Sequence, residues 1–233
     1  MTIRQIGGHI AGIRHYRGNE FLSNKKMTIV NGLDLFKNDP LLFKPGTSYK
    51  YSTYGWNLLS VVIQNASNKN YFSYMEDAIF SPLEMNNTVV GNPHIAIKNK
   101  TIFYIKRNNK IKVAPAVNNV FKAAGGGYLS TSEDLIKFGN QLINPTIISK
   151  KSFLELVKTQ KTSNQKNTNY GIGIVVSKTK NNHLKYSHSG GGVGASTHLL
   201  AYPKQEIVIC FLTNLSGVKM KNYINKLEQI LIE

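Results

Sequence analysis

Residues 184–213 carry the sequence LKYSHSGGGVGASTHLLAYPKQEIVICFLT, in which three apolar segments are separated by turn residues. Short segments of this kind, bounded by turn residues, are typical of β-strands. The segments are Leu184–His188, Ser196–Tyr202 and Glu206–Thr213. Because Pro203-Lys204-Gln205 separates the last two, they should pair as an antiparallel hairpin. The stretch therefore predicts neighbouring antiparallel strands.

The segments on either side of this stretch extend the predicted sheet. Upstream, Tyr170, Ile172, Ile174 and Val176 alternate with Gly171, Gly173 and Val175, which predicts one more strand. Downstream, the chain should end in a helix that packs on a face of the sheet. The apolar stripe of that helix consists of Met220, Tyr223, Ile224, Leu227, Ile230 and Leu231.

The middle of the chain reads as mostly helical. Helices are predicted from Thr53 onward, through Phe72, Met75 and Ile79, after the capping sequence Ser130–Asp134, and over Ser152–Lys158. A polar hairpin is predicted from Ile102 to Val113, around Arg107-Asn108-Asn109. The expected fold is α/β of the α+β kind: an antiparallel sheet flanked by helices, with an all-helical lobe, in a single domain over residues 1–233.

The composition fits a folded chain with an excess of positive charge. Of the 233 residues, 41% are hydrophobic and 18% charged, and the formal net charge is +17. The lysines are scattered as singles and pairs and form no stripe with aromatic residues, so we expect no nucleic-acid partner. The single cysteine, Cys210, excludes a disulfide within the chain. One of three hypotheses for the function is a basic protein that binds nucleic acid or a membrane surface.

Membrane segments are not expected. No apolar run reaches the ~18 residues of a membrane span. Met1-Thr2-Ile3-Arg4-Gln5 does not continue into the apolar core of a signal peptide. We therefore expect neither an anchor nor a signal peptide in this sequence, while the compartment and the oligomeric state stay open.

Three segments, in this order, resemble the class C β-lactamase and D-Ala-D-Ala carboxypeptidase family within the β-lactamase and penicillin-binding-protein superfamily. Thr2–Gln5 with His9–Tyr16 resembles the segment that follows the family's nucleophile helix. Phe43-Lys44-Pro45-Gly46 followed by Tyr51-Ser52-Thr53 resembles Pro-Gly and then Tyr-x-Asn, with Thr53 in place of the usual Asn. His188-Ser189-Gly190-Gly191 resembles the Lys-Thr-Gly or His-Thr-Gly motif on the strand beside the active site.

Within the family, the chain is most similar to the mitochondrial serine β-lactamase-like proteins and their bacterial relatives. The segments that carry this likeness are Gly12–Tyr16, Leu35–Pro40, Tyr51-Ser52-Thr53 and Gly190–Ser196. In that group, Thr is the usual residue after Tyr-Ser. The resemblance runs from Thr2 to about Leu215 and implies a β-lactamase/transpeptidase-like fold.

The resemblance also implies roles for single residues. Tyr51 would relay a proton, and His188 would stabilise negative charge near the substrate and position the Tyr51 phenol. Thr53, Ser189, Gly190 and Gly191 would bind substrate, and Gly191 would offer one backbone N–H to the oxyanion hole. The ordinary alternatives are a half-buried tyrosine, a strand-edge histidine and a glycine bulge.

The family's acylated serine lies in a Ser-x-x-Lys motif upstream of the segment that opens this sequence. The same spacing occurs at Ser23/Lys26, Ser163/Lys166 and Ser177/Lys180, without the apolar helical run that should follow it. We therefore expect an N-terminally truncated fragment that lacks its nucleophile and is nearly inactive. Such a fragment should have an open sheet edge or an exposed apolar face and marginal stability.

The implied reaction is acyl transfer to water from a small peptide, ester or β-lactam-like substrate, without a cofactor. No metal is expected, because the histidines show no ligand spacing. These histidines are His9, His15, His94, His183 and His198. The alternative function is a non-catalytic module that binds peptides or β-lactams.

Overall fold

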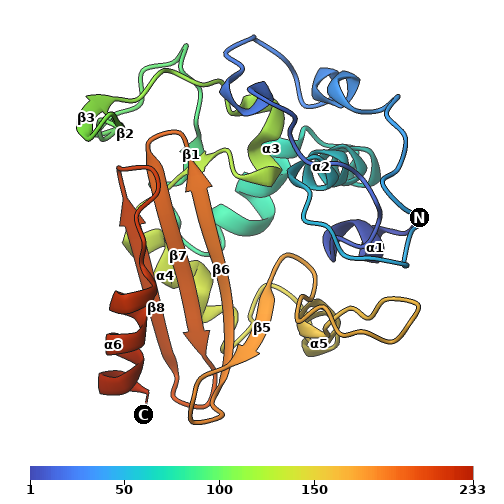
Figure 1. Ribbon diagram of the computed structural model, residues 1–233, viewed down its shortest axis with the longest axis vertical. Helices are drawn as coiled ribbons and strands as arrows, with labels where there is room; N and C mark the ends of the chain where they lie inside the picture. Colours follow the sequence, from blue (N-terminus) through green and yellow to red (C-terminus); the bar gives the residue numbers. More distant parts are fainter. Residues whose placement is uncertain (233) are drawn as a thin grey trace.

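The computed structural model describes residues 1–232, which form a four-stranded antiparallel sheet beside a helical lobe (Figure 1). The strand order is β5-β6-β7-β8. The strands are β5 Val175–Lys178, β6 Leu184–Gly192, β7 Ala195–Tyr202 and β8 Ile207–Thr213. The three strands predicted between residues 184 and 213 are confirmed. The glycine run Gly190–Gly192 belongs to β6 as well.

One edge of β6 is only partly paired. Strand β5 pairs with Leu184–Ser187 and no further. On its other side, β6 pairs with β7 along Tyr186–Gly192. Within the described residues, the β5-side edge of β6 therefore has no partner strand from His188 to Gly192. The aromatic contacts of His188 place this free edge beside the helical lobe.

The alternating run from Tyr170 to Ile174 is not a strand, which corrects the prediction. In this region Val175–Lys178 forms the strand that pairs with β6, and Tyr170 forms only an isolated bridge to Val175. Gly173 has a φ of +74° and its N–H donates to the carbonyl of Gly7. A β-carbon on Gly171 would lie 2.2 Å from the carbonyl oxygen of Leu156. The glycines therefore form a tight turn that packs on α1 and α5, where a strand would not fit.

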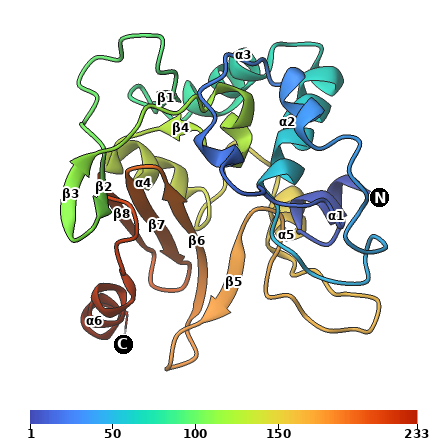
Figure 2. The ribbon, with the colours of Figure 1, turned by 45° about the horizontal axis from the view of Figure 1, so that its top comes forward.

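Two helices cover opposite faces of the sheet (Figures 1 and 2). Helix α6, Lys221–Leu231, packs on the face of Leu200 and Tyr202. The end of α4, Ser132–Asn140, and the turn after it pack on the face of Leu199 and Ala201. Alternate residues of β7 thus point to different layers.

The apolar stripe predicted for the last helix is only half correct. Met220 and Ile224 are buried against the sheet. Tyr223, Ile230 and Leu231 are exposed by 62%, 75% and 46%. The short helix meets the sheet along one narrow row, so the other apolar side chains point away from it.

The helical lobe is built around α2, Thr53–Ser67, which begins where the sequence predicted. The other helices of this region are α1 Ile3–Gly7, η1 Glu20–Leu22, η2 Asn31–Leu35, α3 Tyr71–Met75, the π-turn η3 Glu76–Phe80 and η4 Val120–Gly125. The core contains Ile6, Phe36, Tyr54 and Leu59. The second predicted helix thus appears as α3 and η3, and the fourth as α5, Lys150–Val157.

A buried arginine fixes the loop that precedes α2. Arg14 is 6% exposed and forms ion pairs with Glu20 at 2.7 Å and with Asp39 at 2.5 Å. Its Nη2 also donates to the carbonyl of Leu35. Tyr54 in α2 donates its hydroxyl to Glu20. Because one guanidinium serves several partners, it joins the loop to η2 and α2.

Two short antiparallel pairs complete the fold. Strand β1, Val89–Val90, pairs with β4, Tyr128–Leu129. Strands β2, Tyr104–Arg107, and β3, Lys110–Val113, form the predicted hairpin. Asn108 and Asn109 at its turn have φ values of +50° and +58°, as a type I′ turn requires. Among residues 1–232, no helix has the length and apolar character that crossing a membrane requires.

Candidate active site

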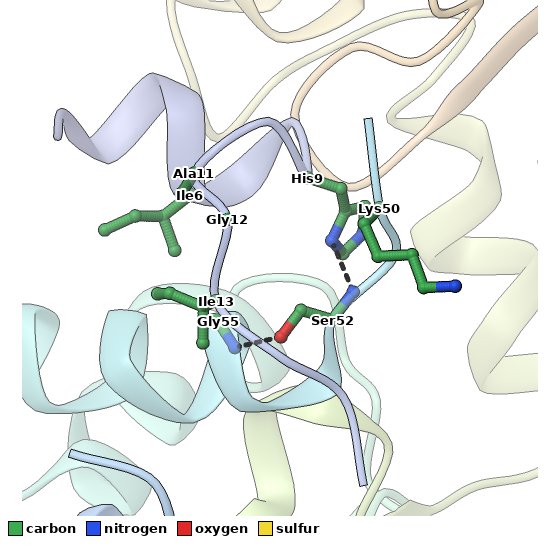
Figure 3. A pocket seen from close by; sticks show the side chains of 8 residues that line it. All are labelled: Ile6, His9, Ala11, Gly12, Ile13, Lys50, Ser52 and Gly55. Atoms are coloured by element: carbon green, nitrogen blue, oxygen red, sulfur yellow. Dashed lines mark hydrogen bonds between the residues drawn. The ribbon is translucent and has the colours of Figure 1, made fainter. Parts of the chain in front are cut away.

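The start of α2 holds the second motif in place. Ser52 is the N-cap of α2 and accepts a hydrogen bond from Gly55 N–H at 3.0 Å. Its hydroxyl donates to the carbonyl of Arg14 at 2.7 Å. Its backbone N–H donates to His9 Nδ1 at 3.1 Å (Figure 3). These three bonds fix the backbone next to Tyr51.

The crevice of Figure 3 is not a binding site for substrate. Its walls are Ile6, His9, Ala11, Gly12, Ile13, Lys50, Ser52 and Gly55. It has no room for a water-sized sphere. Its role is structural, because it joins the 9–13 loop to the first turn of α2.

Tyr51 and His188 meet across the junction between the lobe and the sheet. Their ring centroids are 6.3 Å apart. Tyr170, in the turn before β5, places its hydroxyl 2.9 Å from His188 Nε2. His9 packs between the tyrosines, 4.2 Å from the ring of Tyr51 and 4.8 Å from that of Tyr170. Residues far apart in sequence thus form one cluster of rings at the free edge of β6.

The cluster is uncharged at neutral pH. Burial raises the pKa of Tyr51, although a hydrogen bond with Thr53 opposes this shift. Burial lowers the pKa of His188, and a hydrogen bond with the backbone of Ser189 opposes it. Burial, His188 and His15 together lower the pKa of His9 to about 3. The tyrosine hydroxyls therefore keep their protons, and the imidazoles stay neutral.

Thr53 lies behind Tyr51 in the first turn of α2. It is 5% exposed, and its backbone N–H donates to His15 Nδ1 at 3.2 Å. A β-carbon on Gly125 would lie 2.3 Å from Thr53 Cγ2. The close approach of this glycine explains one member of the run Gly125–Gly127. Thr53 is therefore enclosed by protein.

Ser189, Gly190 and Gly191 lie further along β6, in the wall of a second cavity. This cavity has a volume of about 570 Å³ and lies between the sheet and α6. A β-carbon on Gly190 would lie 2.3 Å from Thr197 Oγ1. A β-carbon on Gly191 would meet nothing within 4 Å. The backbone at Gly191 therefore has open space beside it, as the approach of a substrate would require.

None of the Ser-x-x-Lys matches has the geometry of a nucleophile. Ser23 follows the short helix η1, Ser163 lies in a turn, and Ser177 lies in β5. Ser216 and Lys219 have the same spacing and form a fourth match, beyond the three named from the sequence. Ser216 donates its hydroxyl to the carbonyl of Gly192 and accepts from Gly194 N–H. No serine of the matches begins a helix, so none has a helix dipole to activate it.

Metal chemistry has no candidate site in the described part of the chain. Among residues 1–232, no three His, Cys, Asp or Glu side chains are grouped to hold an ion. Cys210 is a free, half-buried thiol on β8.

Sequence reasoning missed two members of the ring cluster. Tyr170 was assigned to a strand, because its neighbours alternate in polarity. His9 was quoted in the family-like segment His9–Tyr16 and weighed as a metal ligand, but its φ of +59° and its ring contacts appear only in the structure. The contacts of both depend on turns whose geometry no local pattern predicts.

A helical lobe set against the edge of an antiparallel sheet is the architecture of the β-lactamase/transpeptidase-like fold. The family model described as Beta-lactamase matches residues 1–230. The chain therefore belongs to the β-lactamase family of serine hydrolases related to penicillin-binding proteins. This confirms the family and the fold class expected from the sequence.

Two curated relatives illustrate the range of the family. The chain is 36% identical, over 216 residues, to the mitochondrial serine beta-lactamase-like protein LACTB of Bos taurus, covering 81% of this chain and 38% of the relative. It is 29% identical, over 231 residues, to penicillin-binding protein 4* of Bacillus subtilis (strain 168), covering 92% and 51%. The chain thus spans between about two-fifths and one-half of the length of these relatives.

Solved structures agree on the fold. A D-stereospecific amidohydrolase from Streptomyces sp. superposes with a TM-score of 0.83 at 22% identity, covering 98% of this chain and 72% of that one. A penicillin binding protein from Bacillus halodurans gives 0.83 at 19% identity, covering 97% and 71%. At such identities the likeness concerns the fold alone.

Proposed function

We propose that the chain forms part of a serine hydrolase that transfers an acyl group to water through a serine acyl-enzyme. The observation that carries this proposal is the pairing of Tyr51 with His188 at the free edge of β6. Membership of the β-lactamase family supports the reaction class. We further propose that residues 1–233 act as one domain.

Tyr51 is the proposed proton relay. The attacking serine oxygen forms a bond to the carbonyl carbon and gives its proton to the Tyr51 oxygen, while Tyr51 passes its own proton to the leaving group. The bond to the leaving nitrogen or oxygen then breaks. Water repeats the steps on the acyl-enzyme, which releases the acid and restores the serine. The raised pKa of Tyr51 suits this role, because a relay needs a protonated hydroxyl at rest.

The other proposed site residues bind substrate. His188 would stabilise negative charge near the substrate and position the Tyr51 phenol, and Gly191 would offer a backbone N–H from the free edge. Thr53 supports the Tyr51 hydroxyl, and Ser189 and Gly190 line the approach along β6. The proposed substrate class is a small peptide, ester or β-lactam-like molecule, in keeping with the match to the Beta-lactamase family model.

The acylated serine is proposed to lie on polypeptide outside the 233 residues. No serine of the Ser-x-x-Lys matches starts a helix in the described part of the chain. The first experiment is to sequence the DNA upstream of Met1 and look for an in-frame Ser-x-x-Lys followed by an apolar helix. Its presence supports a fragment of a serine hydrolase, and its absence removes the nucleophile from the proposal.

Covalent labelling tests the same proposal on the protein. A fluorophosphonate probe should label the upstream serine of the extended polypeptide and leave the 233-residue chain unlabelled. In the extended form, Tyr51→Phe should slow ester hydrolysis by roughly 10²–10⁴-fold. Labelling of any serine within residues 1–233 would instead locate the nucleophile in this chain.

A non-catalytic binding module is the second candidate, because the ring cluster is present without a suitably placed serine. This candidate predicts that a β-lactam or a D-alanyl peptide raises the melting temperature of the 233-residue chain without product formation. His188→Ala should abolish the rise. A 233-residue chain whose melting temperature does not respond to these ligands contradicts the binding module, whereas the serine hydrolase proposal is decided by the labelling of the extended polypeptide.

A further inference from the structure

The β2–β3 hairpin lies in a long segment without carboxylates. No Asp or Glu occurs between Glu84 and Glu133. Six exposed basic residues fall in this segment: Lys98, Lys100, Lys106, Arg107, Lys110 and Lys112. Within residues 1–232, none of the six is part of an ion pair. The hairpin and the loop before it therefore carry positive charge that the protein does not neutralise.

The same hairpin exposes aliphatic side chains on one face. Val113 lies opposite Tyr104, and Ile111 lies opposite Lys106. Ile102 lies two residues before β2 begins, at the base of the hairpin. Ile102, Ile111 and Val113 are exposed by 57%, 64% and 66%. Lys106 shares the face of Ile111 and Val113, and Arg107, Lys110 and Lys112 lie on the reverse face of the same narrow hairpin. Branched aliphatic residues so exposed, on an element that also carries unpaired cations, indicate an interaction surface.

The base of the hairpin is fixed to the sheet, so the surface is held in one orientation. Tyr104 N–H donates to the carbonyl of Asn214 at 2.8 Å, and Ser216 N–H donates to the carbonyl of Tyr104 at 3.1 Å. Phe103 packs against Gly194 in the β6–β7 turn. Figures 1 and 2 show the hairpin on the opposite side of the sheet from α1 and α5.

We infer that the β2–β3 hairpin docks the protein on an anionic lipid surface. The cations of the hairpin meet the headgroups, and Ile102, Ile111 and Val113 enter the boundary between headgroups and acyl chains. Aliphatic and basic side chains on one exposed element are what such a boundary binds. A nucleic acid would bind the cations but offers little to the three aliphatic side chains, and exposed aromatic residues for stacking are absent from this face.

Sedimentation with lipid vesicles tests the inference on the whole chain. The protein should bind vesicles of phosphatidylcholine mixed with phosphatidylglycerol and not vesicles of phosphatidylcholine alone. Replacement of Lys106, Arg107, Lys110 and Lys112 by Ser should lower binding by at least ~50-fold, because each basic residue near an anionic surface is worth roughly a factor of five. The matched control replaces the exposed Lys150, Lys151, Lys158 and Lys161 by Ser and removes the same charge.

The contribution of the exposed aliphatic side chains of the hairpin is tested separately. Ile111→Ser with Val113→Ser should weaken binding by ~10-fold at unchanged net charge. In a Val113→Trp variant, tryptophan emission should shift to the blue on vesicle addition, beyond any change seen for Trp56 in the parent chain. Circular dichroism should be the same for all variants, because the altered side chains are exposed.

Three outcomes would overturn the inference. One is an equal loss of vesicle binding in the hairpin variant and the Lys150 control, which indicates general charge attraction. Another is vesicle binding that is unchanged in the Ile111→Ser/Val113→Ser variant, together with no blue shift in the Val113→Trp variant. The third is tighter binding to duplex DNA than to vesicles, lost on removal of the hairpin charges, which assigns the surface to nucleic acid.

Discussion

Tyr170 controls the orientation and tautomer of His188. The Tyr170 hydroxyl keeps its proton, because burial and the neighbouring Tyr51 and Tyr49 raise its pKa. This hydroxyl can donate to Nε2 of the neutral His188, 2.9 Å away, and in that arrangement the ring proton lies on Nδ1. If His188 binds substrate as proposed, Tyr170 acts as a positioning residue.

We expect Tyr170→Phe to weaken ligand binding by ~5–10-fold and to raise the pKa at which His188 titrates, since the hydrogen bond favours the neutral ring. NMR of the His188 ring follows the titration, and a thermal-shift assay follows binding. Tyr49→Phe is the control, because the Tyr49 ring lies 6.0 Å from that of Tyr170 and, within residues 1–232, forms no hydrogen bond with His188. An unchanged His188 titration in Tyr170→Phe contradicts the assignment.

His9 makes stability depend on pH. Its pKa is about 3 in the folded chain, against 6.5 when unperturbed. Between these values the unfolded chain binds a proton that the folded chain does not, so stability is lost as pH falls below 6.5. Glu20 affects stability at lower pH. Burial raises its pKa, but hydrogen bonds from Arg14, Arg17 and Tyr54 outweigh burial and lower the pKa to about 2.

From pH 6.5 to pH 5, the free energy of unfolding should fall by up to ~1.4 kcal/mol per pH unit for each such histidine. His9→Asn should remove the contribution of this histidine to the slope of the unfolding free energy against pH. Asn is chosen because it tolerates the positive φ of the site. Urea unfolding at several pH values measures both slopes. His94→Asn, at an exposed position, is the control and should leave the slope unchanged.

At the scale of elements, strand β6 contains two neighbouring glycines, Gly190 and Gly191, that should respond differently to substitution by alanine. Gly191→Ala should leave the melting temperature unchanged, because its β-carbon meets open space, and should weaken ligand binding if substrate approaches there. Gly190→Ala should lower the melting temperature, because its β-carbon meets Thr197 Oγ1. Thermal unfolding with and without a β-lactam checks both. Normal binding by Gly191→Ala contradicts a substrate contact at this position.

The loop before α2 depends on Arg14 more than on its neighbour Arg17. Arg14→Met should cost about 2–4 kcal/mol, because it leaves Glu20 and Asp39 without their buried partner. Arg17 is 58% exposed and 3.3 Å from Asp39, so Arg17→Met should cost less than about 1 kcal/mol. Urea unfolding compares the two. Equal costs would mean that the network is only a surface feature.

The elements also show what a sequence can predict. The strand segments of β6 to β8, the Asn108-Asn109 turn, the start of α2 and the capping sequence of α4 were predicted, because each is determined by neighbouring residues. The turn at Gly171–Gly173 was missed, since it forms only where α1 and α5 approach it. Motif resemblance identified Tyr51 and His188, but the contacts of Tyr170 and His9 arise from tertiary packing alone.

At the scale of the whole molecule, two electrostatic effects oppose each other. A net charge of +17 repels itself and destabilises the folded chain. Ion pairs such as Lys69–Asp77 at 2.8 Å attract, but their side chains are more than half exposed and contribute little. Repulsion between the positive charges should therefore exceed the attraction within the ion pairs, and salt should stabilise the protein by screening this repulsion.

Raising sodium chloride from about 0.01 M to about 1 M shortens the screening length from ~30 Å to ~3 Å. We expect the melting temperature to rise by about 3–6 °C, as a gain of ~1–2 kcal/mol would produce in a domain of this size. The Ser variant of Lys150, Lys151, Lys158 and Lys161 has four fewer positive charges, so it should start from a higher melting temperature and gain less from salt. Sucrose at equal osmolality controls for effects that do not involve charge. A melting temperature that falls with salt would mean that attraction within the ion pairs, including the Arg14 network, exceeds the repulsion of the whole surface.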